Sequence, residues 1–262
     1  MTNTAIEMIG VGKRFTRTGN GSGDYEAICN FNLSIEEGEF FCLLGPTGCG
    51  KSTVLHLIAG FEMPTAGEVR VFGEDVRQPG ADRAVVFQTE LAIFPWLTVE
   101  ENVSFGMRMR GVPSEEQTRS LETNLQLVGL TPHRHKFPRE LSGGMKQRVQ
   151  IARVLANNPR ILLMDEPFAA LDAQTRRRMQ EEAARIWAAT GKTVVFVTHD
   201  IGEALWLADR IGVMTCGPRA CVKDIVEVTL PRPRATMTPE FVRLFNDLGQ
   251  IIQAEAEAML HE

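Results

Sequence analysis

The chain has 262 residues, of which 44% are hydrophobic, enough to bury a sizeable core in one large domain or two small ones. Lys and Arg total 28 against 33 Asp and Glu, so no overall positive field attracts nucleic acid, and we expect no nucleic-acid partner. The five cysteines are odd in number and lack the two-residue spacing of zinc or dithiol sites, which favours free thiols in a reducing compartment.

The chain shows neither the basic cluster and apolar run of a targeting signal nor a stretch long enough to cross a bilayer. Its longest apolar runs, such as residues 40–44 and 161–164, are far too short. We therefore expect any membrane association to go through another protein.

Short apolar runs bounded by turn residues recur along the chain and predict buried parallel strands with helices between them, an α/β pattern. These runs cover residues 40–44, 84–87, 161–164, 193–197 and 211–214. Ahead of them, residues 16–24 are rich in Gly, Ser and Thr and predict an exposed loop that extends a hairpin.

Residues 98–156 interrupt this alternation and predict a helical insertion. Within 115–128, for example, Leu121, Leu125 and Val128 fall on one helix face.

The C-terminal part begins with a segment, residues 231–234 (Pro-Arg-Pro-Arg), that cannot continue a helix or a central strand and predicts a linker. Thr238 and Pro239 then form a helix cap and first turn. The helix that follows carries an apolar stripe, which we expect to pack on the core, with partner binding as the alternative: Phe241, Leu244, Phe245, Leu248, Ile251 and Ile252.

Residues 45–52 fit the phosphate-loop pattern G-x-x-x-x-G-K-[ST], between a predicted strand and an apolar helix over 53–59. The glycines let backbone N–H groups turn around a β-phosphate, and the helix presents its positive dipole end to the same anion. Lys51 adds charge at the β- and γ-phosphates, and the Ser52 hydroxyl is a hard ligand for Mg²⁺. An ordinary glycine-rich turn is the alternative. The predicted ATP-binding residues are Gly45, Pro46, Thr47, Gly48, Cys49, Gly50, Lys51, Ser52 and Thr53.

Two adjacent carboxylates, Asp165 and Glu166, end the strand at 161–164. At the carboxyl edge of a parallel sheet, Asp165 can hold Mg²⁺ through water, and Glu166 can accept a proton from an attacking water. His199 follows the strand at 193–197, where it can hydrogen-bond a γ-phosphate or position the water. An acidic turn and a structural histidine are the alternatives.

A second anion site is predicted at the start of the helix over 146–156. Residues 141–145 read Leu-Ser-Gly-Gly-Met, so Ser142 offers a hydroxyl and Gly143 and Gly144 offer bare backbone at a helix N-terminus. A plain helix cap is the alternative.

In this order, the phosphate loop, the Ser142 signature, the Asp165-Glu166 strand end and His199 resemble an ATP-binding cassette ATPase over nearly the whole chain. The resemblance implies a RecA-like P-loop NTPase core, an antiparallel β subdomain and a helical subdomain that carries the signature. It places the α/β core at 1–88 and 160–230, the helical subdomain at 89–159, and a linker and helix at 231–262.

The resemblance also assigns further roles. Gln88 links the nucleotide site to a transmembrane subunit and contributes with Ser52 and Asp165 to the Mg²⁺ site, and Asp172 lies at a dimer interface. Phe15 stacks on adenine, with Tyr25 as a rival. Met145 departs from the Gln usual after the two signature glycines.

The implied mechanism uses ATP and Mg²⁺ in a head-to-tail homodimer, where the signature of one copy closes over the ATP of the other. Glu166, His199 and Gln88 are the catalytic group. Residues 94–103 and residues 225–234, which end in Leu-Pro-Arg-Pro-Arg, resemble importer ATPases for nitrate, sulfonate and taurine. These imply transmembrane permease subunits, a periplasmic or extracellular solute-binding protein, and a peripheral position on the cytoplasmic face of the membrane. An exporter ATPase, a non-transport cassette ATPase and a nucleotide-binding regulator without turnover are the alternatives.

Overall fold

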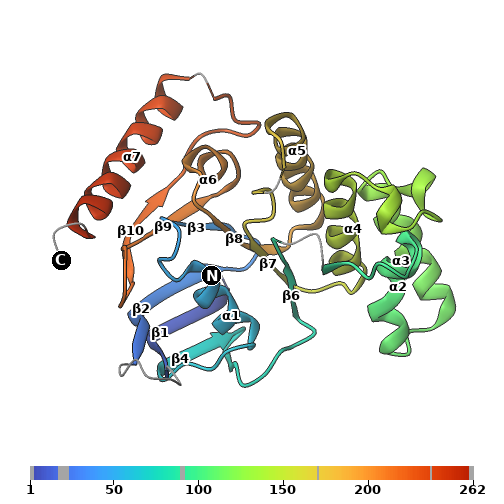
Figure 1. Cartoon of the computed structure of the whole chain (residues 1–262), viewed down its shortest axis with the longest axis horizontal. Helices are drawn as coiled ribbons and strands as arrows, with labels where there is room; N and C mark the ends of the chain where they lie inside the picture. Colours follow the sequence, from blue (N-terminus) through green and yellow to red (C-terminus); the bar gives the residue numbers. More distant parts are fainter. Residues whose placement is uncertain (1–2, 17–23, 89–91, 170, 237, 260–262) are drawn as a thin grey trace. The chain divides into compact units, whose positions relative to one another are not determined.

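The computed structural model describes residues 3–16, 24–88, 92–169, 171–236 and 238–259. The chain forms two compact units, one from residues 1–80 and 192–262 and the other from 81–191 (Figure 1). The domain boundaries expected at 88/89 and 159/160 stay predictions.

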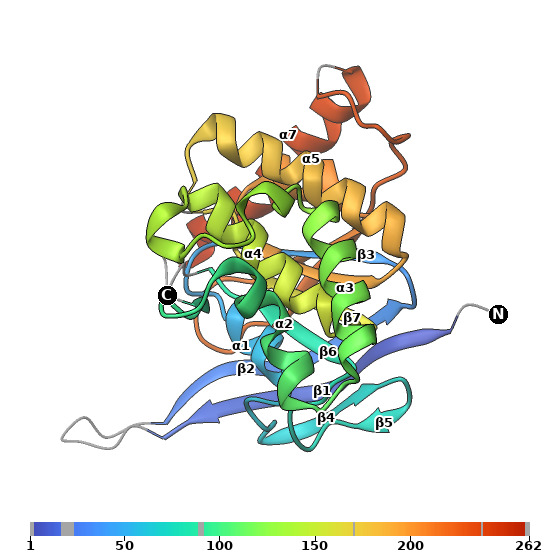
Figure 2. The same ribbon diagram turned by 90° about the vertical axis from the view of Figure 1, so that its right-hand side faces the viewer.

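The first unit contains an antiparallel sheet in the order β2-β1-β4-β5 (Figure 2). Its strands are β1 (Thr4–Phe15), β2 (Tyr25–Glu36), β4 (Ala66–Val71) and β5 (Glu74–Asp75). The second half of β2 alternates between buried and exposed residues because one face of this sheet packs on the core. β1 and β2 pair from Phe15 opposite Tyr25, as the predicted hairpin requires, while residues 17–23 of the predicted loop lie outside the described residues.

A second set of strands in this unit runs in the order β10-β9-β3-β8. It comprises β3 (Phe40–Leu44), β8 (Thr193–Thr198), β9 (Arg210–Met214) and β10 (Val222–Glu227), with β3 parallel to β8 and β9. Every residue of β3 and β8 is buried, which explains their continuous apolar sequences. Helix α1 (Lys51–Ala59) packs on β8, β4 and β2.

Two further helices of this unit pack on each other, α6 (Ile201–Leu207) and α7 (Pro239–Met259). Phe241 N donates to Thr238 Oγ1 at 3.2 Å, as the predicted cap requires. Phe241 and Leu248 are buried, so the apolar stripe packs on the core as predicted, although Phe245 of the same stripe is 42% exposed.

The second unit joins two parallel strands, β6 (Arg83–Val86) and β7 (Ile161–Asp165), to a group of helices. The helices are α2 (Val99–Met109), α3 (Ser114–Leu127), η2 (Thr131–His133), η3 (Pro138–Glu140), α4 (Gly143–Ala156) and α5 (Ala173–Thr190). α2, α3 and α4 pack against one another, which agrees with the predicted helical insertion.

The start of α2 is fixed by two polar residues. Thr98 and Glu101 form a capping box, with Thr98 N donating to Glu101 Oε2 at 2.7 Å. Asn102 is fully buried and its Nδ2 donates to three carbonyls, those of Phe94, Leu97 and Thr98. Asn102 therefore holds the preceding turn in one conformation. Over the residues that the structure describes, no helix combines the length and apolar character needed to span a bilayer.

Candidate functional site

The phosphate loop follows β3 and leads into α1, as the sequence predicts. Lys51 is only 4% exposed, and its Nζ donates to the carbonyls of Gly45 and Pro46 at 2.8 Å each. A buried ammonium needs such partners because an unpaired charge in the interior is very costly. The ammonium is thus held over its own loop, where carbonyl contacts can be exchanged for phosphate oxygens.

Glycine is required in the loop for two separate reasons. Gly48 and Gly50 have φ of +85° and +94°, a left-handed conformation that other residues adopt only with strain. A Cβ at Gly45 would lie 2.8 Å from Cys49 Sγ, and one at Gly50 would lie 2.8 Å from Ile28 Cδ1. Backbone conformation and close packing together dictate the glycine spacing that made the motif visible.

The start of α1 favours an anion. Its first turn contains no acidic residue, and Gly50 is the N-cap without a side chain that could occupy the helix end. Cys49 is buried, and this burial raises the pKa of its thiol. The structure therefore favours the neutral thiol over a thiolate stabilised by the helix end. Cys49 acts as a small packing residue.

His199 lies at the same edge of the parallel strands as the phosphate loop. Leu44 of β3 pairs with Thr198 of β8, so the chain continues into Gly45 on one strand and His199 on the next. The neighbours of His199 are firmly held, because Thr198 Oγ1 donates to Glu203 Oε2 at 2.6 Å and Asp200 caps α6 through Glu203 N. His199 itself is exposed. Within the first unit, the structure brings these two predicted elements together.

The second unit brings three other predicted residues to one strand edge. Val86 of β6 pairs with Met164 of β7, so Gln88 lies shortly beyond one strand while Asp165 and Glu166 end the other. Glu166 has φ of +42°, a left-handed conformation unusual for a non-glycine residue and further opposed by the proline that follows. Strained backbone of this kind often accompanies a functional residue. Sequence reasoning did not predict the conformation.

The signature residues begin α4, in the second unit. Ser142 is the N-cap, and its Oγ accepts from Met145 N at 3.4 Å. A Cβ on Gly144 would lie 2.7 Å from Thr175 Cγ2 of α5, so close helix packing requires glycine there. These residues therefore have a structural role as a cap and a packing contact, in addition to the predicted anion site.

Asp172 is the N-cap of α5, a role that sequence reasoning missed. Its Oδ1 accepts from Gln174 N at 3.1 Å and Thr175 N at 3.0 Å. These hydrogen bonds lower the pKa of the carboxyl group, with the Thr175 contacts the largest cause. An aspartate immediately before a helix start was the available signal, because α5 begins at Ala173.

Phe15 and Tyr25 are opposite one another across the β1–β2 pair, so both aromatic side chains share one face of the hairpin. Lys13 Nζ lies 4.9 Å from the centroid of the Phe15 ring and donates to Glu62 Oε2 at 2.6 Å. Both residues therefore stay open as the predicted adenine platform.

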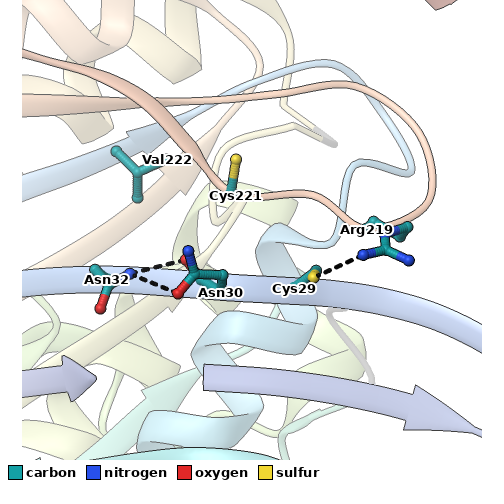
Figure 3. Close-up of a pocket in the computed structure, with 6 residues that line it drawn as sticks. All are labelled: Cys29, Asn30, Asn32, Arg219, Cys221 and Val222. Carbon is teal, nitrogen blue, oxygen red and sulfur yellow. Dashed lines mark hydrogen bonds between the residues drawn. The ribbon is translucent and has the colours of Figure 1, made fainter. Parts of the chain in front are cut away.

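A hollow of about 420 Å³ lies beside β2, and none of the residues that line it is a predicted site residue (Figure 3). It is lined by Cys29, Asn30, Asn32, Arg219, Cys221 and Val222. Arg219 Nη2 donates to Cys29 Sγ at 3.4 Å, and both thiols are free. Across the described parts of the chain, no group of three or more His, Cys, Asp or Glu side chains is arranged to hold a metal ion.

Comparison with known proteins decides the family. A sequence profile described as ABC transporter matches residues 28–169, more than half of the chain. This chain belongs to the ABC transporter family. The family and the fold class predicted from the motifs are therefore confirmed.

Two relatives are similar over most of their length. The nitrate import ATP-binding protein NrtD of Synechococcus elongatus is 46% identical over 86% of this chain and 81% of its own length. The bicarbonate transport ATP-binding protein CmpD of Synechocystis is 48% identical over 81% of this chain and 76% of its own length. A solved ATP-binding cassette, a dimer in a post-hydrolysis state with ADP and Pi, is 32% identical over 85% of this chain and 98% of that chain, with a TM-score of 0.72.

Proposed function

We propose that this chain binds and hydrolyses ATP to power uptake of a small inorganic oxyanion, such as nitrate or bicarbonate, through a separate permease. The observation that carries the proposal is the sequence identity of 46% and 48% to two proteins named for import or transport of such ions, over 86% and 81% of this chain. These names favour an importer over an exporter or a non-transport ATPase.

The residues of the first unit fit a nucleotide. Three features of the phosphate loop suit the β- and γ-phosphates. Lys51 is buried and hydrogen-bonded to main-chain carbonyls that phosphate oxygens can replace, two glycines have left-handed backbone, and the first turn of α1 contains no acidic residue. Ser52, Asp165 and Gln88 would hold Mg²⁺, which needs few carboxylates when phosphates supply its other oxygens. When bound, the ion neutralises phosphate charge as hydrolysis proceeds.

Glu166 takes a proton from the attacking water, while Gln88 and His199 respond to the γ-phosphate. Ser142, Gly143 and Gly144 of a second copy close over the same phosphate, and Asp172 lies at the dimer interface. The N-terminus of α4, a 14-residue helix with Ser142 exposed, supports this arrangement, as does the dimeric state of the solved relative. Two sites then form across a head-to-tail homodimer.

The partners follow from this role. The homodimer binds permease subunits at the cytoplasmic face of the membrane, and a solute-binding protein delivers the oxyanion on the other side. Hydrolysis resets the dimer, and the permease converts its closing and opening into transport.

Uptake in the native host tests the proposal. Removal of the gene is expected to abolish uptake of labelled nitrate or bicarbonate, and the natural chain should restore it while Glu166→Gln should not. Unchanged uptake of both ions, with loss of export or of another solute's uptake, would overturn the assignment.

A further inference from the structure

Arg234 is a buried cation surrounded by main-chain carbonyls. It is 4% exposed, and its guanidinium donates to Leu205 O at 2.9 Å, Ala208 O at 2.6 Å and Val228 O at 3.2 Å. Burial lowers the pKa of this guanidinium to about 10. A charge in the interior is tolerated only where hydrogen bonds satisfy it, and here three main-chain carbonyls do so.

The carbonyls that Arg234 binds include those at the C-terminal end of α6. Arg232 adds to them, with Nη2 donating to Leu207 O at 2.7 Å and to Asp209 Oδ1 at 2.6 Å. The last carbonyls of a helix have no partner within the helix and form its negative dipole end, so two guanidinium groups stabilise this end strongly. The segment predicted as a linker is therefore an anchor for α6.

The other end of α6 begins two residues after His199. Asp200 caps it, and Glu203 joins it to Thr198 at the end of β8. α7 also approaches this end, since a Cβ on Gly249 would lie 3.9 Å from Ile201 Cδ1. A helix of seven residues is unstable alone, so its position depends on what holds its two ends.

We infer that Arg234 is a positioning residue for His199 and acts through α6, an inference that rests on the proposed function. The helix is about 10 Å long, so a displacement at the arginine end is passed to the histidine end as a rigid movement. A small misplacement of a group that contacts the reacting phosphate slows the reaction much more than it weakens binding. The rate of ATP turnover thereby depends on the C-terminal segment that carries Arg234.

A double-mutant cycle tests the inference. Arg234→Lys keeps the charge but loses the planar set of donors. With the natural His199, we expect single-turnover ATP hydrolysis about tenfold slower or more, with ATP affinity changed less than twofold. In a His199→Ala background the same substitution should have almost no further effect. Arg243→Lys, at an exposed position of α7, is the control and should leave both quantities unchanged.

An equal slowing in both backgrounds, or no slowing at all, would overturn the inference. If Arg234→Lys does not fold, as judged by circular dichroism, the milder Arg232→Lys serves in the same cycle with a smaller loss expected. The NMR signal of the His199 ring gives a readout independent of turnover. It should shift or broaden in Arg234→Lys without nucleotide, and an unchanged signal contradicts the inference even if the natural chain proves not to hydrolyse ATP.

Discussion

The phosphate loop and the end of β7 both carry polar residues at strand ends, but they do so in opposite ways. In the loop, the left-handed positions are glycines, and the charged Lys51 is buried among carbonyls. At the end of β7, the left-handed position is occupied by Glu166, a residue that pays a conformational cost there.

The difference separates binding from chemistry. A cradle for phosphates needs a relaxed backbone that can present its N–H groups, so glycine suits it. A proton acceptor needs its side chain in one place, and a strained backbone is tolerated where the surrounding structure enforces it. Substitutions at the two sites test this difference.

Lys51→Ala should have the largest effect, because it removes the charge that the loop positions over the phosphates. Loss of a charged hydrogen bond of this kind costs about 2 to 3 kcal/mol, roughly a hundredfold in ATP affinity. Isothermal titration calorimetry with ATP measures it. Lys223→Ala, on the exposed edge of β10, should bind ATP like the natural chain. Equal affinities of the two variants would contradict the role of Lys51.

Gly144→Ala should destabilise the second unit by about 2 kcal/mol through overpacking, because the new Cβ meets Thr175 Cγ2 at 2.7 Å. Thr175→Ser removes that methyl group and should restore most of the loss in the double variant. Urea unfolding measures the free energy of unfolding of the single and the double variant. If Thr175→Ser rescues nothing, close packing is not the reason for glycine in the signature.

Glu166→Gly and Glu166→Ala both remove the carboxylate but differ in backbone cost. We expect the glycine variant to be about 1 kcal/mol more stable than the alanine variant. Gly48→Ala should lose stability for the converse reason, because alanine is strained in the left-handed backbone of Gly48 even though a Cβ there has open space around it. Gly111 also has left-handed backbone with open space around it. Gly111→Ala is therefore the control, because it introduces the same backbone strain outside the predicted nucleotide site. Equal stability of the two Glu166 variants would show that no strain is stored there.

The smallest effect concerns pH. Hydrogen bonds in the folded chain lower the pKa of Asp172, so its contribution to stability is fully present above the ordinary aspartate pKa near 3.8 and is lost as pH falls through the lowered value. Asp172→Asn should keep the cap but remove this pH dependence. Melting temperatures between pH 2 and 6 measure it, and parallel curves for the two proteins would contradict the assignment.

Periodicity and turn residues were sufficient to predict the parallel strands of both units, but they did not locate β10 or the strands of the antiparallel sheet. The five predicted runs fall within one residue of β3, β6, β7, β8 and β9. Most residues of β3, β7, β8 and β9 are buried, and buried strands are continuous apolar segments. The phosphate loop was predictable for a similar reason, since left-handed backbone and close packing both demand glycine at fixed places.

Side chains that satisfy several main-chain carbonyls at once were not predictable. No sequence pattern distinguishes Arg234 or Asn102 from other polar residues, yet each donates hydrogen bonds to several main-chain carbonyls. The left-handed conformation of Glu166 has no local signal either, because neither glutamate nor a following proline favours it. For Arg234, the carbonyls of Leu205 and Ala208 lie 29 and 26 residues earlier in the chain, beyond the reach of any local pattern.

The most direct test of the account is Mg²⁺-dependent ATP hydrolysis measured together with size in solution, for the natural chain and Glu166→Gln. We expect the variant to lose hydrolysis while ATP traps it as a stable dimer, because binding and closure survive without the proton acceptor. Hydrolysis by Glu166→Gln at the natural rate, or an absence of ATP-promoted dimers in both proteins, would contradict it.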